Sequence, residues 1–267
     1  MELKAPAKVN WHLAVGSKRP DGYHPILSVF QLCSLHDVLE VELSSGPFSV
    51  SVQGLEALCE KGTSTLDKAA VLWHEETGFD RAVNIKIKKN IPSSAGLGGG
   101  SSDAASLLLY LNSLREKPFD RAALMSLGAK VGCDLPFFLS GCNAAVVTGL
   151  GEKVRPIEAR TDLSGFIIIR DTEKVSTKEA YSALDSRKNV PVLDSYGAKL
   201  EQIYRRPVGE WSFYNDFDMV NAEPDIRVLK GEKLILTGSG SCYVLLTDRK
   251  SLELPRGCKA VKVEFHT

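Results

Sequence analysis

Four glycines fall within five positions of one segment, IPSSAGLGGGSSDAASLLLYLN, which covers residues 91–112. Alternating apolar and polar residues over 82–91 predict a strand before the glycines, and an Ala- and Leu-rich run over 102–115 predicts a helix after them. Residue types that cap helices stand between the glycines and this helix: Ser101, Ser102 and Asp103. The order strand, glycine loop and helix N-terminus predicts a loop whose backbone N–H groups bind an anion, most often phosphate.

This glycine loop differs from two common phosphate-binding fingerprints. No Gly-Lys-Ser/Thr follows the glycines, so it is not a Walker A loop, and the third glycine of the dinucleotide fingerprint is missing. A loop that is merely flexible or tightly packed stays an alternative. A phosphoryl-transfer enzyme also needs groups that orient the attacking hydroxyl and neutralise charge. Isolated charged residues in apolar surroundings are the candidates for that role.

Two such residues are Lys8 and Asp134. Lys8 lies in APAKVNWHLAV (residues 5–15), where it shares one face of a predicted strand with Asn10. A lysine that reaches solvent from an edge strand is the alternative. Asp134 lies in VGCDLPFFLSG (residues 131–141), where we expect its carboxylate to be at least partly buried and to need a partner. A helix N-cap or a turn is the alternative for Asp134.

Two turns add further candidates. RPDGYHPI (residues 19–26) predicts a turn that presents Tyr23 and His24, a pair able to stack on a planar base and hydrogen-bond it. TGSGSC (residues 237–242) is a second Gly-Ser turn, placed between two predicted strands. It either touches substrate or phosphates or only connects the strands. For both turns a purely structural role stays open.

Length and composition indicate an ordinary globular protein. The chain has 267 residues, of which 43% are hydrophobic and 25% charged, with a net charge of zero. Zero net charge argues against broad capture of nucleic acid or of an anionic membrane. We find no apolar run of the roughly 18 residues that a membrane span needs, and no signal peptide. Six cysteines without a C-x-x-C pair predict reduced, mostly buried thiols in a cytoplasm.

The elements that must position these residues mix strands and helices. Further strands are predicted at 48–54, 143–152, 165–170 and 259–265, with two more within 233–248. Further helices are predicted at 66–78, 119–132, about 176–185 and about 194–205. The pattern predicts an α+β fold with two domains, over residues 1–155 and 156–267.

Six segments resemble the GHMP kinase superfamily, which includes galactokinase, homoserine kinase and mevalonate kinase. They are PAKVNWHL, RPDGYHPILSVFQ, AGLGGGSSDAA, GCDLPFFLSG, YNDFD and GSGSC, in the same order and over nearly the whole chain. The glycine loop matches the superfamily, whereas PAKVN and DGYH match its branch that phosphorylates a cytidine-diphosphate alcohol. The resemblance implies a GHMP kinase fold, with a ribosomal-protein-S5-like N-terminal domain and a ferredoxin-like C-terminal domain.

The activity implied by this resemblance is ATP- and Mg²⁺-dependent phosphorylation of the tertiary 2-hydroxyl of 4-diphosphocytidyl-2-C-methyl-D-erythritol. This step belongs to the methylerythritol phosphate route to isoprenoid precursors. We expect a cytoplasmic monomer or weak homodimer that binds neither nucleic acid nor membrane.

The resemblance also implies roles for the matching residues around the reacting groups. Asp134 accepts or orients the proton of the 2-hydroxyl. Lys8 lies against Asp134, holds it ionised and helps to neutralise the transferring phosphoryl group. Asn10 contacts the substrate near the reacting hydroxyl. The ATP phosphate loop consists of Pro92, Ser93, Ser94, Ala95, Gly96, Leu97, Gly98, Gly99, Gly100, Ser101 and Ser102.

The nucleobase end of the substrate has its own implied contacts. Tyr23 and His24 hold the cytosine, and Tyr181 in STKEAYSAL stacks on its other face. Thr177 lines the same site. The two aromatic rings form a clamp for a planar base, and hydrogen bonds at His24 help to select cytosine over uracil.

Three positions depart from the family pattern or stay unassigned by it. Asp103 stands where the family also has Asn, and its negative charge is unhelpful near phosphates unless it caps the helix or meets Mg²⁺. Thr65 stands where many relatives contact the adenine through an Asn, so we expect Lys89 to carry more of the adenine contact. Ser102 is a candidate Mg²⁺ ligand, but a glutamate to accompany it is not identifiable, so the metal ligands are unassigned.

Two other functions compete with this interpretation. One is a sibling kinase that acts on homoserine, mevalonate or a sugar, and DGYH together with Tyr181 argues against it because those substrates carry no nucleobase. The other is a non-catalytic, kinase-like sensor of ATP and ligand. The presence of both Lys8 and Asp134 argues against a sensor.

Overall fold

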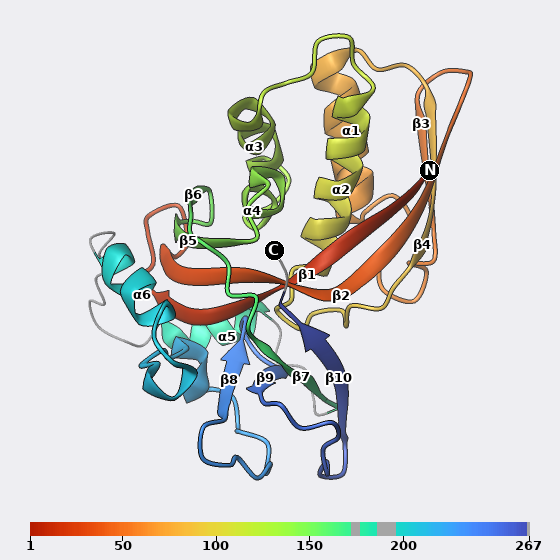
Figure 1. The fold of residues 1–267 in the computed structure, drawn as a ribbon. Helices are drawn as coiled ribbons and strands as arrows, with labels where there is room; N and C mark the ends of the chain where they lie inside the picture. Colours follow the sequence, from red (N-terminus) through yellow and green to blue (C-terminus); the bar gives the residue numbers. More distant parts are fainter. Residues whose placement is uncertain (172–176, 186–195, 266–267) are drawn as a thin grey trace. The chain divides into compact units, whose positions relative to one another are not determined.

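A computed structural model describes residues 1–171, 177–185 and 196–265 of the chain (Figure 1). Two compact units make up the fold, and each is assembled from separate stretches of sequence. The first unit comprises residues 1–7, 35–93 and 98–141, and the second comprises 8–34, 94–97 and 142–267. Two long strands, β1 (Glu2–Val15) and β2 (Ile26–Ser44), have residues in both units. The predicted domain boundary at residue 155 stays a prediction.

The helices of the first unit pack on one another and on a small sheet. Strand β3 (Ser49–Gln53) pairs in parallel with β4 (Ala82–Lys88), and β4 pairs antiparallel with residues 38–44 of β2. Helix α1 (Thr65–Thr77) packs on α2 (Gly99–Ser113) and on β3, whereas α3 (Arg121–Ala129) packs on α4 (Leu135–Ser140). Burial alternates along β4, with Val83, Ile85 and Ile87 inside. The alternation that predicted this strand is therefore confirmed.

The two central helices of the first unit begin in different ways. Ser64 and Asp67 form a capping box at the start of α1, and Gly78 ends that helix in the left-handed conformation, as predicted. Helix α2 begins at Gly99, three residues earlier than predicted, with Gly98 as its N-cap and no side-chain capping bond. The capping role predicted for Ser101, Ser102 and Asp103 is therefore wrong, since all three lie inside the helix.

The second unit contains two sheets. In the first sheet, residues 26–31 of β2 pair with β5 (Ala144–Gly149), which pairs with β6 (Lys153–Pro156). The other is antiparallel, in the order β10 (Cys258–Glu264), β7 (Ser164–Arg170), β9 (Cys242–Leu246) and β8 (Lys233–Thr237). Between β7 and β8 the chain forms α5 (Thr177–Leu184), α6 (Gly197–Tyr204) and the 3₁₀ turns η2 (Val208–Glu210) and η3 (Asp216–Met219). This strand order is that of a ferredoxin-like sheet, and the predicted α+β class is confirmed.

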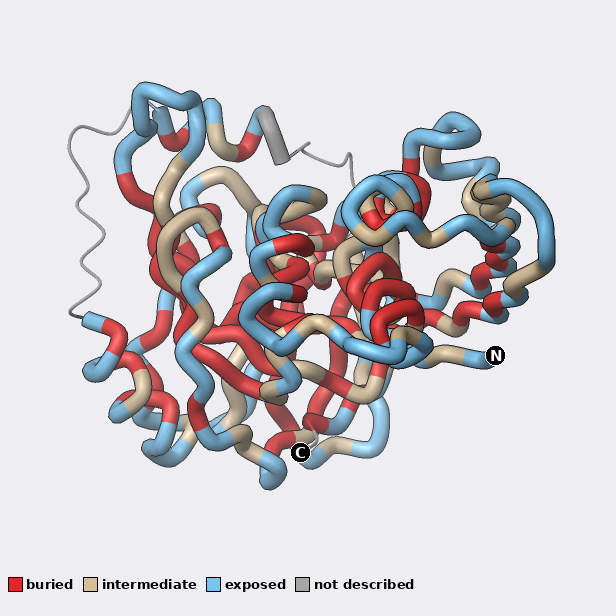
Figure 2. Tube along the Cα trace, turned by 90° about the horizontal axis from the view of Figure 1, so that it is seen from above, coloured by how far each residue is buried: buried red, intermediate tan, exposed pale blue. Residues whose placement is uncertain are grey.

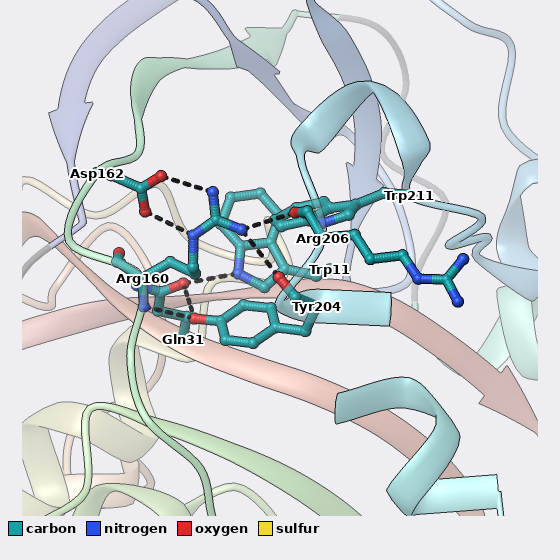
Figure 3. A network of polar contacts seen from close by, with 7 residues as sticks. All are labelled: Trp11, Gln31, Arg160, Asp162, Tyr204, Arg206 and Trp211. Atoms are coloured by element: carbon teal, nitrogen blue, oxygen red, sulfur yellow. Dashed lines mark hydrogen bonds and ion pairs between the residues drawn. The ribbon is translucent and has the colours of Figure 1, made fainter. Parts of the chain in front are cut away.

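A buried polar network links strands β1 and β2 to helix α6 in the core of the second unit (Figure 3). Trp11 Nε1 (2.9 Å) and the Tyr204 hydroxyl (2.6 Å) both donate to Gln31 Oε1. Gln31 Nε2 donates to the carbonyl of Arg160, and the backbone N–H of Arg160 donates to the Tyr204 hydroxyl. Because each buried polar group here has a partner, the network joins β1, β2 and α6 without an unsatisfied group. Residues 8–16 are buried throughout, and Figure 2 shows such buried stretches in red.

Within the described part of the chain, none of the helices has the length and apolar character needed to cross a membrane. The six cysteines are free, as predicted, but only Cys33 and Cys242 are buried. The expectation of mostly buried thiols was therefore wrong.

Candidate active site

Lys8 lies inside the second unit and not at its surface. Its side chain belongs to β1, only 4% of the residue is exposed, and Nζ donates to Asn10 Oδ1 at 2.6 Å. The ammonium also lies 4.3 Å from the centroid of the Phe30 ring. The shared face predicted for Lys8 and Asn10 is confirmed, and the alternative of a lysine that reaches solvent is excluded.

Asn10 is held by two further groups besides Lys8. Its Nδ2 donates to Ser28 Oγ at 3.0 Å, and its backbone N–H donates to Thr237 Oγ1 at 2.9 Å. Since Oδ1 faces an ammonium and Nδ2 faces a hydroxyl, the orientation of the amide is fixed by its partners. Lys8 and Asn10 therefore form a pre-ordered polar pair among the mostly apolar residues of β1.

The second Gly-Ser turn packs directly on the glycine loop. Gly96 has φ 73°, and a Cβ placed on it would lie 2.6 Å from Gly238 Cα. On the other side of this stretch, the carbonyl of Leu97 accepts a hydrogen bond from the backbone N–H of Lys8 at 3.0 Å. The turn that connects β8 and β9 therefore packs against residues 94–97, and a contact of this turn with substrate or phosphates stays a prediction.

In the first unit, the glycine loop continues into the first turn of α2. The first hydrogen bond of the helix runs from Ser102 N to the Gly98 carbonyl, so the N–H groups of residues 99–101 have no intrahelical acceptor. A Cβ on Gly100 would lie 3.2 Å from Thr65 Oγ1. A helix start without a capping side chain, approached closely by its neighbours, fits the binding of phosphate oxygens.

Two buried polar atoms near this helix start lack partners. Ser102 is 1% exposed and Asp103 is 2% exposed, and neither Ser102 Oγ nor Asp103 Oδ1 has a hydrogen-bond partner among the described residues. Orphaned buried polar atoms are rare in folded proteins and call for an explanation. The Ser102 hydroxyl fits a ligand of a Mg²⁺ that the nucleotide brings. The described residues contain no group of three His, Cys, Asp or Glu able to hold a metal by themselves.

Lys89 is occupied by two carboxylates of the first unit. Its Nζ contacts Asp37 and lies 2.8 Å from Asp103 Oδ2. Burial raises the pKa of Asp103 to about 7, against the opposing effect of Lys89. Burial by itself lowers the pKa of Lys89, but the attraction of Asp103 and Asp37 outweighs it and the net direction is upward. The adenine contact predicted for Lys89 and Thr65 stays a prediction.

Asp37 is a charged residue that the sequence reasoning missed. It lies in β2 on the same buried phase as Cys33, Leu35 and Leu39. A carboxylate in the apolar phase of an amphipathic strand was the available signal, because such a group must have a partner. That partner, Lys89, is remote in sequence and was identified only from the structure.

Asp134 occupies the N-cap position of α4 but does not cap it. Its backbone is helical, and its side chain makes no capping bond. The residue is half-buried, as predicted. Pro136 stands at the start of the helix, where a missing N–H costs nothing. The Asp134 side chain therefore does not cap α4.

The nucleobase candidates of the second unit gather around His24. Its Nδ1 lies 2.8 Å from the Gly16 carbonyl, and its Nε2 lies 3.0 Å from Asp185 Oδ1. The His24 and Tyr181 rings are 5.2 Å apart, whereas Tyr23 is 58% exposed on the predicted turn. Thr177 begins α5, and its side chain lies outside the described residues.

Comparisons with known proteins agree on one family. A sequence profile described as the GHMP kinases N terminal domain matches residues 64–142. The chain is 35% identical over 259 residues to the 4-diphosphocytidyl-2-C-methyl-D-erythritol kinase of Thermotoga maritima, which covers 92% of this chain and 91% of that relative. A crystal structure of 4-(cytidine 5'-diphospho)-2C-methyl-D-erythritol kinase matches the whole of both chains at 28% identity with a TM-score of 0.69.

The fold is shared more widely than the sequence. The mevalonate kinase of Methanococcus jannaschii matches 100% of this chain and 98% of its own, with a TM-score of 0.63 but only 13% identity. At that identity the likeness shows the fold alone. The GHMP kinase fold predicted from the sequence is confirmed.

Proposed function

The chain belongs to the 4-diphosphocytidyl-2-C-methyl-D-erythritol kinase family of GHMP kinases, and from this membership we infer how its residues act. It is an ATP-dependent kinase that phosphorylates the 2-hydroxyl of 4-diphosphocytidyl-2-C-methyl-D-erythritol on the methylerythritol phosphate route. The observation that carries this function is the identity over more than nine-tenths of the chain to relatives of that name. Mevalonate kinase, by contrast, shares only the fold.

We propose that residues Pro92 to Ser102 bind the phosphates of ATP, within an N-terminal domain over 1–155. Two observations support this: α2 begins without a capping side chain, and Gly96 lies too close to Gly238 for any other residue. The Ser102 hydroxyl would be a protein ligand of Mg²⁺, which would supply positive charge to neutralise part of the phosphate charge. We propose that Thr65 and Lys89 lie near the adenine of ATP in the same domain.

We propose that Asp134 orients the 2-hydroxyl and that Lys8 neutralises charge on the transferring phosphoryl group. Asp134 supports this because its half-buried carboxylate precedes α4 without capping it, and Lys8 supports it because its ammonium is buried and ordered by Asn10. A carboxylate near a cation is a weak base towards an alcohol. In a loose phosphoryl-transfer transition state the proton leaves late, so orientation counts for more than basicity.

The cytosine is proposed to lie between Tyr23 and Tyr181 and beside His24, with Asn10 and Thr177 nearer the alcohol. The adjacency of the His24 and Tyr181 rings supports this site, since both planar groups come from segments far apart in sequence. Residues 156–267 then complete the substrate site. Homoserine, mevalonate and sugars lack a nucleobase and gain nothing from such a clamp.

We also propose that the enzyme works in the cytoplasm as a monomer or weak homodimer, without nucleic acid or membrane partners. The zero net charge and the six free cysteines support a small-molecule enzyme in a reducing compartment.

The proposal is tested by a coupled assay of ADP release with ATP, Mg²⁺ and one alcohol at a time. We expect turnover with the cytidyl alcohol and none with homoserine or mevalonate. Asp134→Asn is expected to lower kcat by about 10²-fold or more while ATP binding is unchanged. Turnover with another alcohol would contradict the cytosine site, and ATP binding without any turnover would favour the sensor.

A further inference from the structure

Three charged residues form a chain beneath the start of α2 that the proposed reaction does not use. Lys89 Nζ bridges the carboxylates of Asp37 and Asp103. The two carboxylate side chains are 0% and 3% exposed, and that of Lys89 is 16% exposed. Burying three charges is expensive, because each loses its hydration, and apolar residues in their place are often as stable. Such a group calls for a role other than stability.

Asp37 fixes the strand-side stem of the phosphate loop. Its Oδ1 accepts hydrogen bonds from the backbone N–H groups of Asn90 (2.6 Å) and Ile91 (2.8 Å). The next residue is Pro92, where the loop begins. The Asn90 side chain adds a bond to the carbonyl of His36 at 2.8 Å. One buried carboxylate therefore sets the direction in which the backbone enters the loop.

Lys89 and Asp103 fix the helix-side stem. Asp103 lies one turn after Gly99 in α2, so both are on the same face of the helix. A Cβ on Gly99 would lie 3.2 Å from Lys89 Nζ, which places the ammonium against the backbone of the first turn. The three glycines at 98–100 offer no side chain with which to hold this turn. The ion pair between Lys89 and Asp103 instead attaches the first turn of α2 to the residues that precede the loop.

We propose that Asp37, Lys89 and Asp103 are positioning residues for ATP, which hold the two stems of the phosphate loop in register. Lys89 then acts through the two carboxylates and not through the adenine. N–H donors that are held in place before the nucleotide arrives bind it more tightly, because binding then loses no free energy in ordering the loop. The inference rests on the ATP-dependent function proposed above and concerns the nucleotide alone.

The test is a set of four variants titrated with MgATP by calorimetry: Asp37→Asn, Asp103→Asn, Lys89→Met and the double variant Lys89→Met/Asp103→Asn. We expect Asp37→Asn and Lys89→Met to weaken ATP binding by about tenfold, as for a lost charged hydrogen bond. The KM for the cytidyl alcohol should stay within about twofold of the wild type. Asp103→Asn should also weaken ATP binding, and the double variant should bind ATP no more weakly than Lys89→Met, because both changes break the same ion pair.

The matched control is Glu76→Gln, which breaks the exposed 2.5 Å pair between Lys130 and Glu76 in the same unit and should leave ATP affinity unchanged. If Lys89→Met weakens ATP binding and neither Asp37→Asn nor Asp103→Asn does, Lys89 contacts the nucleotide itself and the proposal is overturned. It is also overturned if Asp37→Asn leaves ATP affinity unchanged, or if the KM for the alcohol rises as ATP affinity and thermal stability fall.

Should Lys89→Met fail to fold, Asp37→Asn alone still decides the question. Calorimetry with MgATP needs no alcohol substrate. Failure of the positioning role and failure of the proposed substrate are therefore seen in separate experiments.

Discussion

The groups around the buried Lys8 side chain in β1 are ones that can receive an ammonium. The Asn10 oxygen accepts its hydrogen bond, and the Phe30 ring presents its electron-rich face at 4.3 Å. Asn10 in turn keeps its own orientation because Ser28 accepts from its nitrogen. The pairing of Lys8 with Asn10 was predictable from their spacing in a strand. The contributions of Phe30 and Ser28 were not, because they come from β2.

Tyr181 provides the residue-scale prediction for the nucleobase site. Tyr181→Ala is expected to raise the KM for the cytidyl alcohol by about tenfold, since stacking of a base on an aromatic ring contributes about 1–3 kcal/mol. The KM for ATP should not change. Steady-state kinetics with each substrate varied in turn measures both constants.

Tyr196, which is 48% exposed and lies 15 residues after Tyr181, is the control for this variant. Tyr196→Ala should leave both constants unchanged. An unaltered KM for the cytidyl alcohol in Tyr181→Ala would show that the ring does not hold the base.

At the scale of elements, apolar sequence patterns predicted the helices and strands more accurately than capping residues did. Strand β4 follows its apolar period, helix α1 ends at the Gly78 stop signal, and β7 matches the continuous apolar run at 165–170. The start of α2 was misplaced because Gly99 and Gly100 are poor helix formers that tertiary contacts nevertheless hold in the helix. Asp37 was missed for a related reason, since its partner Lys89 lies 52 residues away in sequence.

Gly96 gives the element-scale prediction for the glycine loop. Gly96→Ala should lower ATP affinity by about tenfold or more, because its methyl would meet the backbone of Gly238 at 2.6 Å and displace one of the two turns. Calorimetric titration with MgATP provides the measurement.

Gly62→Ala is a matched control, since Gly62 also has a positive φ of 81° but nothing within 4 Å of its added methyl. It should lose only the roughly 1–2 kcal/mol of stability that a left-handed residue costs and keep wild-type ATP affinity. Equal ATP affinities in the two variants would contradict the packing of the loop on the turn.

At the scale of the whole molecule, the buried His12 makes stability depend on pH. Burial lowers the pKa of His12 to about 4, despite the attraction of Asp216. The unfolded chain binds a proton at this residue below its ordinary pKa of 6.5, whereas the folded chain does so only near 4. Stability is therefore lost as pH falls from about 6.5 to 4.

This loss amounts to at most about 3 kcal/mol from His12, at 1.36 kcal/mol per pKa unit. Urea unfolding at several pH values measures it, with His12→Gln as the comparison. We expect the stability of His12→Gln to depend less on pH than that of the wild type over this range. Parallel profiles for the two proteins would assign the pH dependence to other groups.

The central claim is that this kinase transfers a phosphoryl group to the tertiary 2-hydroxyl of a cytidyl alcohol. The most direct measurement is a proton-coupled ³¹P NMR spectrum of the product formed from ATP and 4-diphosphocytidyl-2-C-methyl-D-erythritol. The new phosphomonoester is expected as a singlet, because the carbon that bears the 2-oxygen carries no hydrogen to couple with the phosphorus. A signal split by neighbouring protons would place the phosphate on a primary or secondary hydroxyl, and would contradict the account, as would the absence of any new ester.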